Sequence, residues 1–295
     1  MNHFYQQTHR LALRSRILFL CLLASLAALP AFAQTSWKGT TNSDWNTATN
    51  WSAGVPTATS DVTIPNVTNK PIIGAATTAL VKSVEVQSGA VLTISSSATL
   101  AVNGTNNVPG STAFLNFGTV HNNGQLNLGN TASTGEHGLS NGLGAIFNNN
   151  AGGTITIDRS GQGGLDNRIL TQTAIFTNAG GIIIGATENV GHWGLRNTAT
   201  FNNQAGGTIT SDRSTDYGLQ NVTGTFTNAG VFTIGAIAAV GANGIQNSAN
   251  FANNGCTGII RIVSNSTIVN INPGTFTNSG TIIENATGNS NISSN

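Results

Sequence analysis

Residues 138–284 repeat themselves about every 25 positions, and few folds are open to a chain built in this way. An asparagine stands two residues after each phenylalanine of the repeat, and a second motif, Gly-Leu/Ile-x-Asn, runs in the same period. The phenylalanines are Phe147, Phe176, Phe201, Phe226, Phe251 and Phe276, and isoleucines stand eight residues after the first five of them, at Ile155, Ile184, Ile209, Ile234 and Ile259. Self-similarity at this period is typical of solenoids, in which each repeat packs only on its neighbours.

Short β-type runs separated by Gly and Asn fix the kind of solenoid. Runs such as Thr-Ile-Thr-Ile at 154–157 are too short for helices and favour pleated strands. The sequence therefore predicts an all-β, right-handed parallel β-helix with rungs of about 25 residues. Each Phe is expected to stack on the Phe of the next rung, about 4.8 Å away, and each Asn to join a hydrogen-bonded ladder at a turn. The run 121–124, His-Asn-Asn-Gly, is interpreted as an earlier copy of the Gly-Leu/Ile-x-Asn motif.

Composition excludes several function classes. Charged residues make up only 7% of the chain, and the formal net charge is +1. No basic patch can therefore neutralise a run of phosphates, so we expect no nucleic-acid partner. Apolar residues are too scattered for a membrane bundle, and we expect no membrane span.

The N-terminal residues 1–33 are typical of a cleaved export signal. Three arginines precede an apolar stretch, and Ala31-Phe32-Ala33 forms an A-x-A cleavage site before Gln34. The mature chain is therefore expected to be secreted, extracellular or on a bacterial cell surface. Cys256 would be its only thiol, and we expect a small buried residue there rather than a reactive one.

Residues 34–65 form a Trp-rich segment ahead of the repeats. Trp37, Trp45 and Trp51 are expected to cover the open end of the solenoid, with sugar stacking as the alternative role. The sequence thus divides into a signal peptide at 1–33, a cap at 34–65 and β-helix repeats at 66–295. No closing element follows the Phe276 rung, so we expect the solenoid to be truncated at its C-terminus.

The motifs of this segment resemble those of a known group of proteins. Trp-Lys-Gly at 37–39, Asp-Trp at 44–45, Asn-Trp-Ser at 50–52 and Asp-Val-Thr-Ile-Pro at 61–65 are similar to the opening of secreted Bacteroidota-type cell-surface parallel β-helix proteins. The resemblance extends more loosely to autotransporter and adhesin-like solenoids. It implies an extracellular, surface-associated solenoid and brings no catalytic residues.

One row of aligned residues is the best ligand-binding candidate. The residue before each Gly-Leu/Ile pair is, in order, His137, Gly163, Trp193, Tyr217 and Asn243. If exposed, Trp193 and Tyr217 on adjacent rungs would make a flat platform for a sugar ring, beside His137. Strand alternation favours the opposite orientation, with Trp193 pointing inward.

Two aligned acids are the candidates for an enzyme. Asp158 and Asp212 occupy the same place two rungs apart, about 9.6 Å, near the upper limit for inverting glycosidases. Glu188 is expected to project from the rung between them. The alternative is a solvated loop in which each Asp pairs with an Arg, an ion pair worth little to stability.

Metal ligands do not gather in the sequence. The histidines fall in different rungs, so we expect no metal site and no cofactor. Ca²⁺ remains open only through four aspartates in the same half of the rungs, Asp158, Asp166, Asp212 and Asp216.

These observations predict a secreted or cell-surface structural and adhesive solenoid without catalytic activity. The alternatives are a polysaccharide-binding or polysaccharide-degrading β-helix protein and a passive stalk for a missing domain. An extracellular glycan or a host or cell-surface protein is the expected partner, and the chain is expected to be monomeric.

Overall fold

The computed structural model describes residues 33–105, 111–169, 173–263, 267–284 and 292–294. All but the last residue of the predicted signal peptide therefore lies outside the described residues. The chain divides into two units, Met1–Ala33 and Gln34–Asn295, and the second contains the fold.

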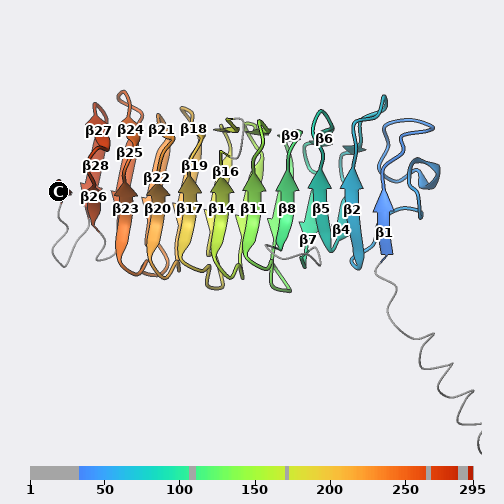
Figure 1. The fold of residues 1–295 in the computed structure, drawn as a ribbon, viewed down its shortest axis with the longest axis horizontal. Coiled ribbons are helices and arrows are strands. Elements are labelled where there is room, and N and C mark those ends of the chain that lie inside the picture. The colour runs from blue at the N-terminus through green and yellow to red at the C-terminus, as the bar shows by residue number, and fades with distance from the viewer. Residues whose placement is uncertain (1–32, 106–110, 170–172, 264–266, 285–291, 295) are drawn as a thin grey trace, which may run out of the picture. The chain divides into compact units, whose positions relative to one another are not determined.

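Three parallel sheets form the walls of this unit, and each rung from β2 to β28 contributes one strand to each sheet (Figure 1). The first sheet contains β1 (Ala33–Ser36), β2 (Ser60–Ile64), β5 (Ser83–Val86), β8 (Thr112–Asn116), β11 (His137–Asn141), β14 (Gly163–Asn167), β17 (Trp193–Asn197), β20 (Tyr217–Asn221), β23 (Asn243–Asn247), β26 (Ile268–Asn270) and β29 (Ile292–Ser294). The second contains β3 (Ile72–Ile73), β6 (Val91–Ile94), β9 (Thr119–Asn122), β12 (Ile146–Asn149), β15 (Ile175–Asn178), β18 (Thr200–Asn203), β21 (Thr225–Asn228), β24 (Asn250–Asn253) and β27 (Thr275–Asn278). The third contains β4 (Thr78–Val81), β7 (Thr99–Val102), β10 (Gln125–Leu128), β13 (Thr154–Ile157), β16 (Gly181–Ile184), β19 (Thr208–Ser211), β22 (Val231–Ile234), β25 (Ile259–Ile262) and β28 (Thr281–Glu284). A single 3-10 turn, η1 (Ala48–Asn50), is the one helical element among the described residues.

The coil is right-handed. In Figure 1 the strands of the first sheet face the viewer and point upward, while successive rungs follow one another from right to left. The chain then passes behind to the second and third sheets before it returns one rung further on. The predicted all-β parallel solenoid is therefore confirmed.

A column of phenylalanine rings runs through the core. The rings from Phe147 to Phe276 stack on the second sheet with centroids 4.8–5.0 Å apart and interplanar angles of 2–15°. Phe147, Phe176, Phe201, Phe226 and Phe251 are fully buried. Burying each such side chain contributes roughly 1.5–3 kcal/mol, and the stacking confirms the predicted row.

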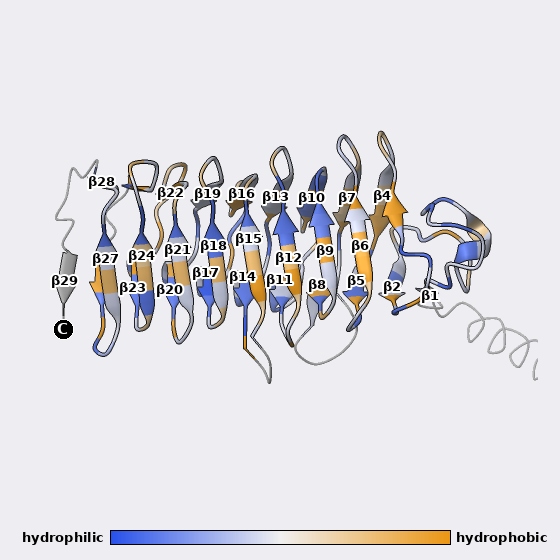
Figure 2. Cartoon of the chain, turned by 90° about the horizontal axis from the view of Figure 1, so that it is seen from above, coloured by the Kyte–Doolittle hydropathy of each residue, from blue (hydrophilic) through white to orange (hydrophobic). Residues whose placement is uncertain are grey.

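Two ladders of asparagines, buried except for their last members, run parallel to this column, as predicted. In the ladder that closes the second sheet, each side-chain amide donates to the Oδ1 of the next Asn at 2.7 Å, from Asn122 to Asn278. The ladder that closes the first sheet runs from Asn116 to Asn270, with distances of 2.6–2.9 Å. Figure 2 shows strands of the second sheet turning from orange to blue along their length, where Phe gives way to Asn.

The ladders also correct one alignment made from the sequence. His121 and Asn122 belong to β9 in the second sheet, where Asn122 pairs with Asn149. The first-sheet strand of that rung is β8, and its ladder residue is Asn116. The 121–124 run is therefore a copy of the Phe-x-Asn motif and not of the Gly-Leu/Ile-x-Asn motif.

The structure has a second, longer period of two rungs. Turns from the third sheet to the first are alternately long, at 129–136, 185–192 and 235–242, and short, at 158–162 and 212–216. Turns from the second sheet to the third alternate as well: 150–153 and 204–207 are longer by two residues than 179–180 and 229–230. The solenoid is therefore built from pairs of unlike rungs.

This alternation corrects the predicted isoleucine row. Ile155 aligns with Ile182, and Ile184 aligns with Ile157, so a constant spacing of eight residues after Phe alternates between two columns. Ile155, Ile209, Ile184 and Ile234 still face the core, because a shift of two residues is one full period of a strand. Ile259, the last of the row, is only half-buried.

The Trp-rich segment closes the N-terminal end of the core. Trp37, Trp45 and Trp51 are only 1–2% exposed, and Trp51 packs edge-to-face against both of the others. Their burial leaves no ring face for the alternative role in sugar stacking. The segment predicted as a cap also supplies β1 and β2, which are the first two strands of the first sheet.

Candidate functional site

The predicted ligand row lies on the outer face of the first sheet. His137, Gly163, Trp193 and Tyr217 are register partners at the start of successive strands. The expectation that Trp193 points inward is wrong, because its side chain is half-buried on the outside. The glycine that follows it takes the inward position: a Cβ on Gly194 would lie 2.0 Å from the buried Ser211 Oγ. This glycine breaks the strand alternation, so the residues on both sides of the Gly-Leu pair face outward.

The indole of Trp193 fills the space that Gly163 leaves open. A Cβ on Gly163 would lie 2.0 Å from the indole Nε1, so only glycine admits the ring here. The ring centroid lies 6.0 Å from that of His137, and the guanidinium carbon of Arg196 lies 5.2 Å from it.

Tyr217 does not extend this ring into a platform. Its hydroxyl accepts a hydrogen bond from Gln246 Nε2 at 3.3 Å, one rung further on. Among the described residues, the aromatic partners of Trp193 are His137 and His192. Trp193 and Tyr217 are thus neighbours in the sheet, but the ring that Trp193 approaches in this row is that of His137.

Next to Trp193 lies a cluster of buried polar groups, which we call the Asp166 site: His137, Ser140, Asp166, Arg168 and Trp193. Asp166 is 1% exposed, Ser140 is fully buried and His137 is 6% exposed. Among the described residues, hydrogen-bond partners are absent for both Asp166 carboxylate oxygens, His137 Nδ1, Ser140 Oγ, Arg168 Nε and Trp193 Nε1. Asp166 Oδ2 lies 3.9 Å from His137 Nε2 and 3.7 Å from an Arg168 terminal nitrogen.

Burial decides the charge of the imidazole in this site. Desolvation lowers the pKa of His137 below its ordinary value, and Asp166 opposes this by a smaller amount. Burial thus favours the neutral form of His137 at neutral pH, beside a carboxylate without hydrogen-bond donors among the described residues. Sequence reasoning named Asp166 only as a calcium candidate. The available signal was a charged residue at the variable position of the Gly-Leu-x-Asn motif, directly before the ladder Asn.

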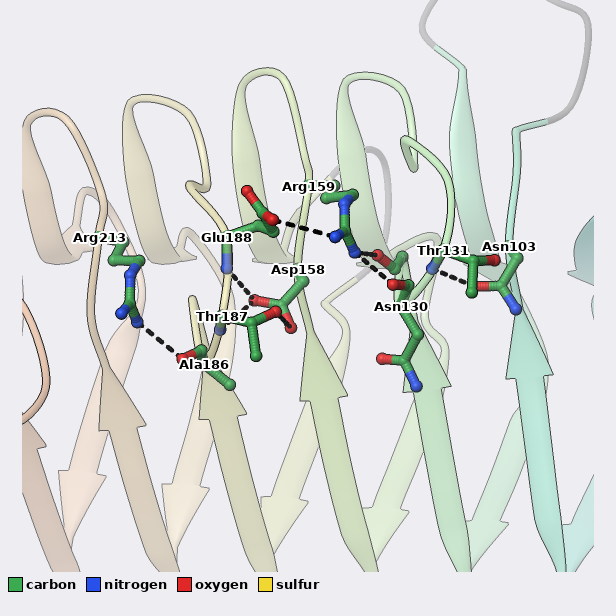
Figure 3. Close-up of polar contacts among 10 residues, drawn as sticks. Asn103, Asn130, Thr131, Asp158, Arg159, Ala186, Thr187, Glu188 and Arg213 are labelled. Atoms are coloured by element: carbon green, nitrogen blue, oxygen red, sulfur yellow. Dashed lines mark hydrogen bonds and ion pairs between the residues drawn. The ribbon is translucent and has the colours of Figure 1, made fainter.

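The predicted acid pair lies elsewhere, in the short turns after the third sheet, and Figure 3 shows its first member, Asp158. Asp158 is 2% exposed and accepts hydrogen bonds at 3.1 Å from the Thr187 amide, the Thr187 hydroxyl and the Glu188 amide of the next rung. Asp212 is fully buried, and its Oδ1 accepts from the Ile237 amide at 3.3 Å. Burial raises the pKa of Asp212, and backbone amides partly oppose that shift.

The arginines that follow these acids reach the opposite way. Arg213 donates to the carbonyls of Gly185 and Ala186 at 2.7 Å, one rung back. Arg159 likewise donates to the carbonyls of Gly129 and Asn130, and it pairs with Glu188 at 3.0 Å. The expected solvated loop in which each Asp pairs with an Arg is therefore wrong: both acids are buried, and each Asp-Arg turn holds the rung after it with Asp and the rung before it with Arg.

The remaining candidates are dispersed. The described residues contain no group of three or more His, Cys, Asp or Glu side chains that could hold a metal ion. Asp216 pairs with His192 at 2.7 Å, on the exposed side of the turns. Cys256 is exposed in the turn between β24 and β25, so the expectation of a buried thiol is wrong.

Comparison with known proteins gives one match. A family model described as a domain of unknown function (DUF8693) matches residues 36–253, which is more than half of the chain. No curated protein and no solved structure matches. No helix in the described part of the chain is long and apolar enough to cross a membrane.

Proposed function

From the premise that the chain belongs to the DUF8693 family, a domain of unknown function, we propose that it is a secreted or cell-surface solenoid with a structural and adhesive role. The observation that carries this proposal is the continuity of the stack. Two asparagine ladders and a phenylalanine column link the same rungs without a break from β12 to β27. Such a rod holds its outer faces at fixed spacing, which suits display of a binding surface.

The acids of the enzyme alternative have a structural use instead. Asp158 accepts three hydrogen bonds from the neighbouring rung, and Asp212 is buried against a turn. A general acid or base must reach a proton of the substrate. Carboxylates that are buried and hydrogen-bonded to a neighbouring turn are poorly placed to do so. This supports an adhesive role over polysaccharide degradation.

Polysaccharide binding keeps support of its own. The Asp166 site combines a half-buried indole with buried polar atoms that lack partners. Aromatic rings with a few polar groups beside them are common in ligand sites. The adhesive surface would then be the outer face of the first sheet.

Export of the full chain from a bacterial host tests the proposal. We expect a mature species outside the cytoplasm whose first residue is Gln34, as read by N-terminal sequencing. Ala33→Leu should block this cleavage, because the site requires small residues, while Phe32→Leu at the middle position should not. Retention of both the wild type and Phe32→Leu in the cytoplasm would contradict the proposal. Release of reducing ends from polysaccharides by the purified chain would contradict it as well.

A further inference from the structure

We propose that the Asp166 site binds a neutral glycan through vicinal hydroxyls of one sugar ring. In this arrangement the hydroxyls donate to the Asp166 carboxylate and accept from Trp193 Nε1 and Arg168 Nε. The inference deepens the adhesive role proposed above and rests on it, because it names the ligand class and the residues of the adhesive surface.

The first argument is the unpartnered carboxylate. Asp166 is 1% exposed, and neither of its oxygens has a hydrogen-bond partner in the part of the chain that the structure describes. Buried polar atoms in folded proteins nearly always have partners, because burying an unsatisfied charge costs several kcal/mol. An ion pair does not remove the deficit here, since the nearest Arg168 nitrogen lies 3.7 Å away. These atoms have almost no accessible surface in the structure, so ordered water or a bound molecule can supply the missing donors only after the side chains that cover them move apart.

The second argument is that donors and acceptors without partners lie in one cluster. Asp166 offers only acceptors when ionised, whereas Trp193 Nε1 and Arg168 Nε offer only donors. A cation would leave the two N–H donors without acceptors, and an anion would be repelled by the Asp166 carboxylate. A hydroxyl group donates and accepts at once, so a pair of neighbouring hydroxyls can use both kinds of group.

The third argument is the charge balance around the site. Asp166 and Glu136 carry negative charges, Arg168 and Arg196 carry positive charges, and all four act on His137 or lie beside it. Burial lowers the pKa of His137, which favours its neutral form. The surroundings are thus balanced in charge, which favours a neutral sugar over a uronate.

The site also continues along the solenoid. In the outward row of Asp166 the next rung carries Arg196, and the two rungs after it carry Gln220 and Gln246, which are hydrogen-bonded to each other at 2.8 Å. This row gives a linear glycan further polar contacts along the first sheet, beyond the ring at Trp193.

Tryptophan fluorescence reports on this site selectively. The chain has four tryptophans, and Trp37, Trp45 and Trp51 are buried at the N-terminal end. A change in emission on titration is therefore assigned to Trp193. We expect at least one of laminarihexaose, cellohexaose and mannohexaose to give a saturable shift with the full-length chain, and trigalacturonate to give none.

Isothermal titration calorimetry on variants tests the residues. Asp166→Asn keeps the shape but removes the charge and one acceptor, and we expect it to weaken binding at least tenfold. Glu188→Gln, an equivalent change in an exposed turn, should leave the affinity unchanged. Arg168→Gln is a second variant, also expected to weaken binding, in case Asp166→Asn fails to fold as judged by far-UV circular dichroism.

Three results would overturn the proposal. Heat from trigalacturonate alone would show that the charge argument fails, and equal affinity of wild type, Asp166→Asn and Arg168→Gln would show that the ligand binds elsewhere. If none of the four oligosaccharides changes the tryptophan emission or releases heat, the site holds ordered water only. Because export and cleavage at Gln34 are measured separately, that result would leave the proposed surface role standing.

Discussion

Asparagine serves this fold at two corners because its side chain resembles a backbone amide. The amide of Asn178 donates to Asn203 Oδ1 at 2.7 Å and to the Thr208 carbonyl at 3.2 Å, while its own Oδ1 accepts from Asn149. Aspartate at the same place would lose both donors, and Leu would leave the carbonyl unpaired in the core. Each ladder residue therefore satisfies backbone groups that the turn would otherwise leave without partners.

The buried imidazole of His137 makes stability depend on pH in a defined direction. Burial lowers the pKa of His137 from its ordinary 6.5, so below that pH the unfolded chain binds a proton that the folded chain does not. This stabilisation is complete above pH 6.5 and is lost as the pH falls through the lowered pKa. We expect urea unfolding midpoints between about pH 7.5 and 5 to fall more steeply for the wild type than for His137→Gln. Parallel curves for the two proteins would contradict the assigned burial effect.

At the scale of elements, the short Asp-Arg turns act as ties between rungs. Each one bonds forward through Asp and backward through Arg, so three consecutive rungs share one turn (Figure 3). Arg159 and Arg213 have φ values of 55° and 54°, a left-handed conformation that Gly185 and Gly235 supply in the alternate turns. The tie thus offsets a backbone conformation that is unfavourable for arginine.

Loss of a forward tie should cost more than loss of a surface ion pair. We expect Asp158→Asn to destabilise the fold by about 1–3 kcal/mol, because an amide nitrogen would then face the N–H donors of Thr187 and Glu188. Glu188→Gln, which removes only the pair with the half-exposed Arg159, should cost less than about 1 kcal/mol. Chemical denaturation followed by circular dichroism compares the two, and an equal loss in both variants would rule out the tie.

Much of this architecture could be predicted from the sequence, and the failures have physical causes. The Phe and Asn rows are visible because each position faces the core in every rung. The isoleucine columns were misaligned because turns that differ by two residues leave the inward face unchanged. Strand alternation predicts an inward Trp193 because it assumes a regular strand, whereas Gly194 takes the inward position in the structure. The Asp166 site could not be predicted, because its parts come from β11, β14 and β17 and only register brings them together.

For the whole molecule, stability is expected to depend on contacts between neighbouring rungs. The strands of each sheet pair only with the strands one rung before and after, from β3 to β28. Unlike rungs alternate, so each long turn packs against short ones: Val190 of a long turn bridges to Ser214 of a short one, and Arg213 holds the carbonyl of Gly185. The unit that can be removed without a mismatch is therefore a pair of rungs and not a single rung.

Two deletions that end at the same residue distinguish these units. Removing residues 163–216 joins Gln162 to Tyr217 and replaces one Asp-Arg turn with the other, so long and short turns still alternate. Removing residues 193–216 joins His192 to Tyr217 and brings two long turns together, without Arg213 to bind Gly185 or Asp212 to bind Ile237. We expect the longer deletion to unfold in a single transition at nearly the denaturant midpoint of the full chain, and the shorter deletion to unfold earlier. A higher denaturant midpoint for the single-rung deletion would contradict this expectation. It would show that single rungs are interchangeable and that the alternation of long and short turns contributes nothing to the stability of the fold.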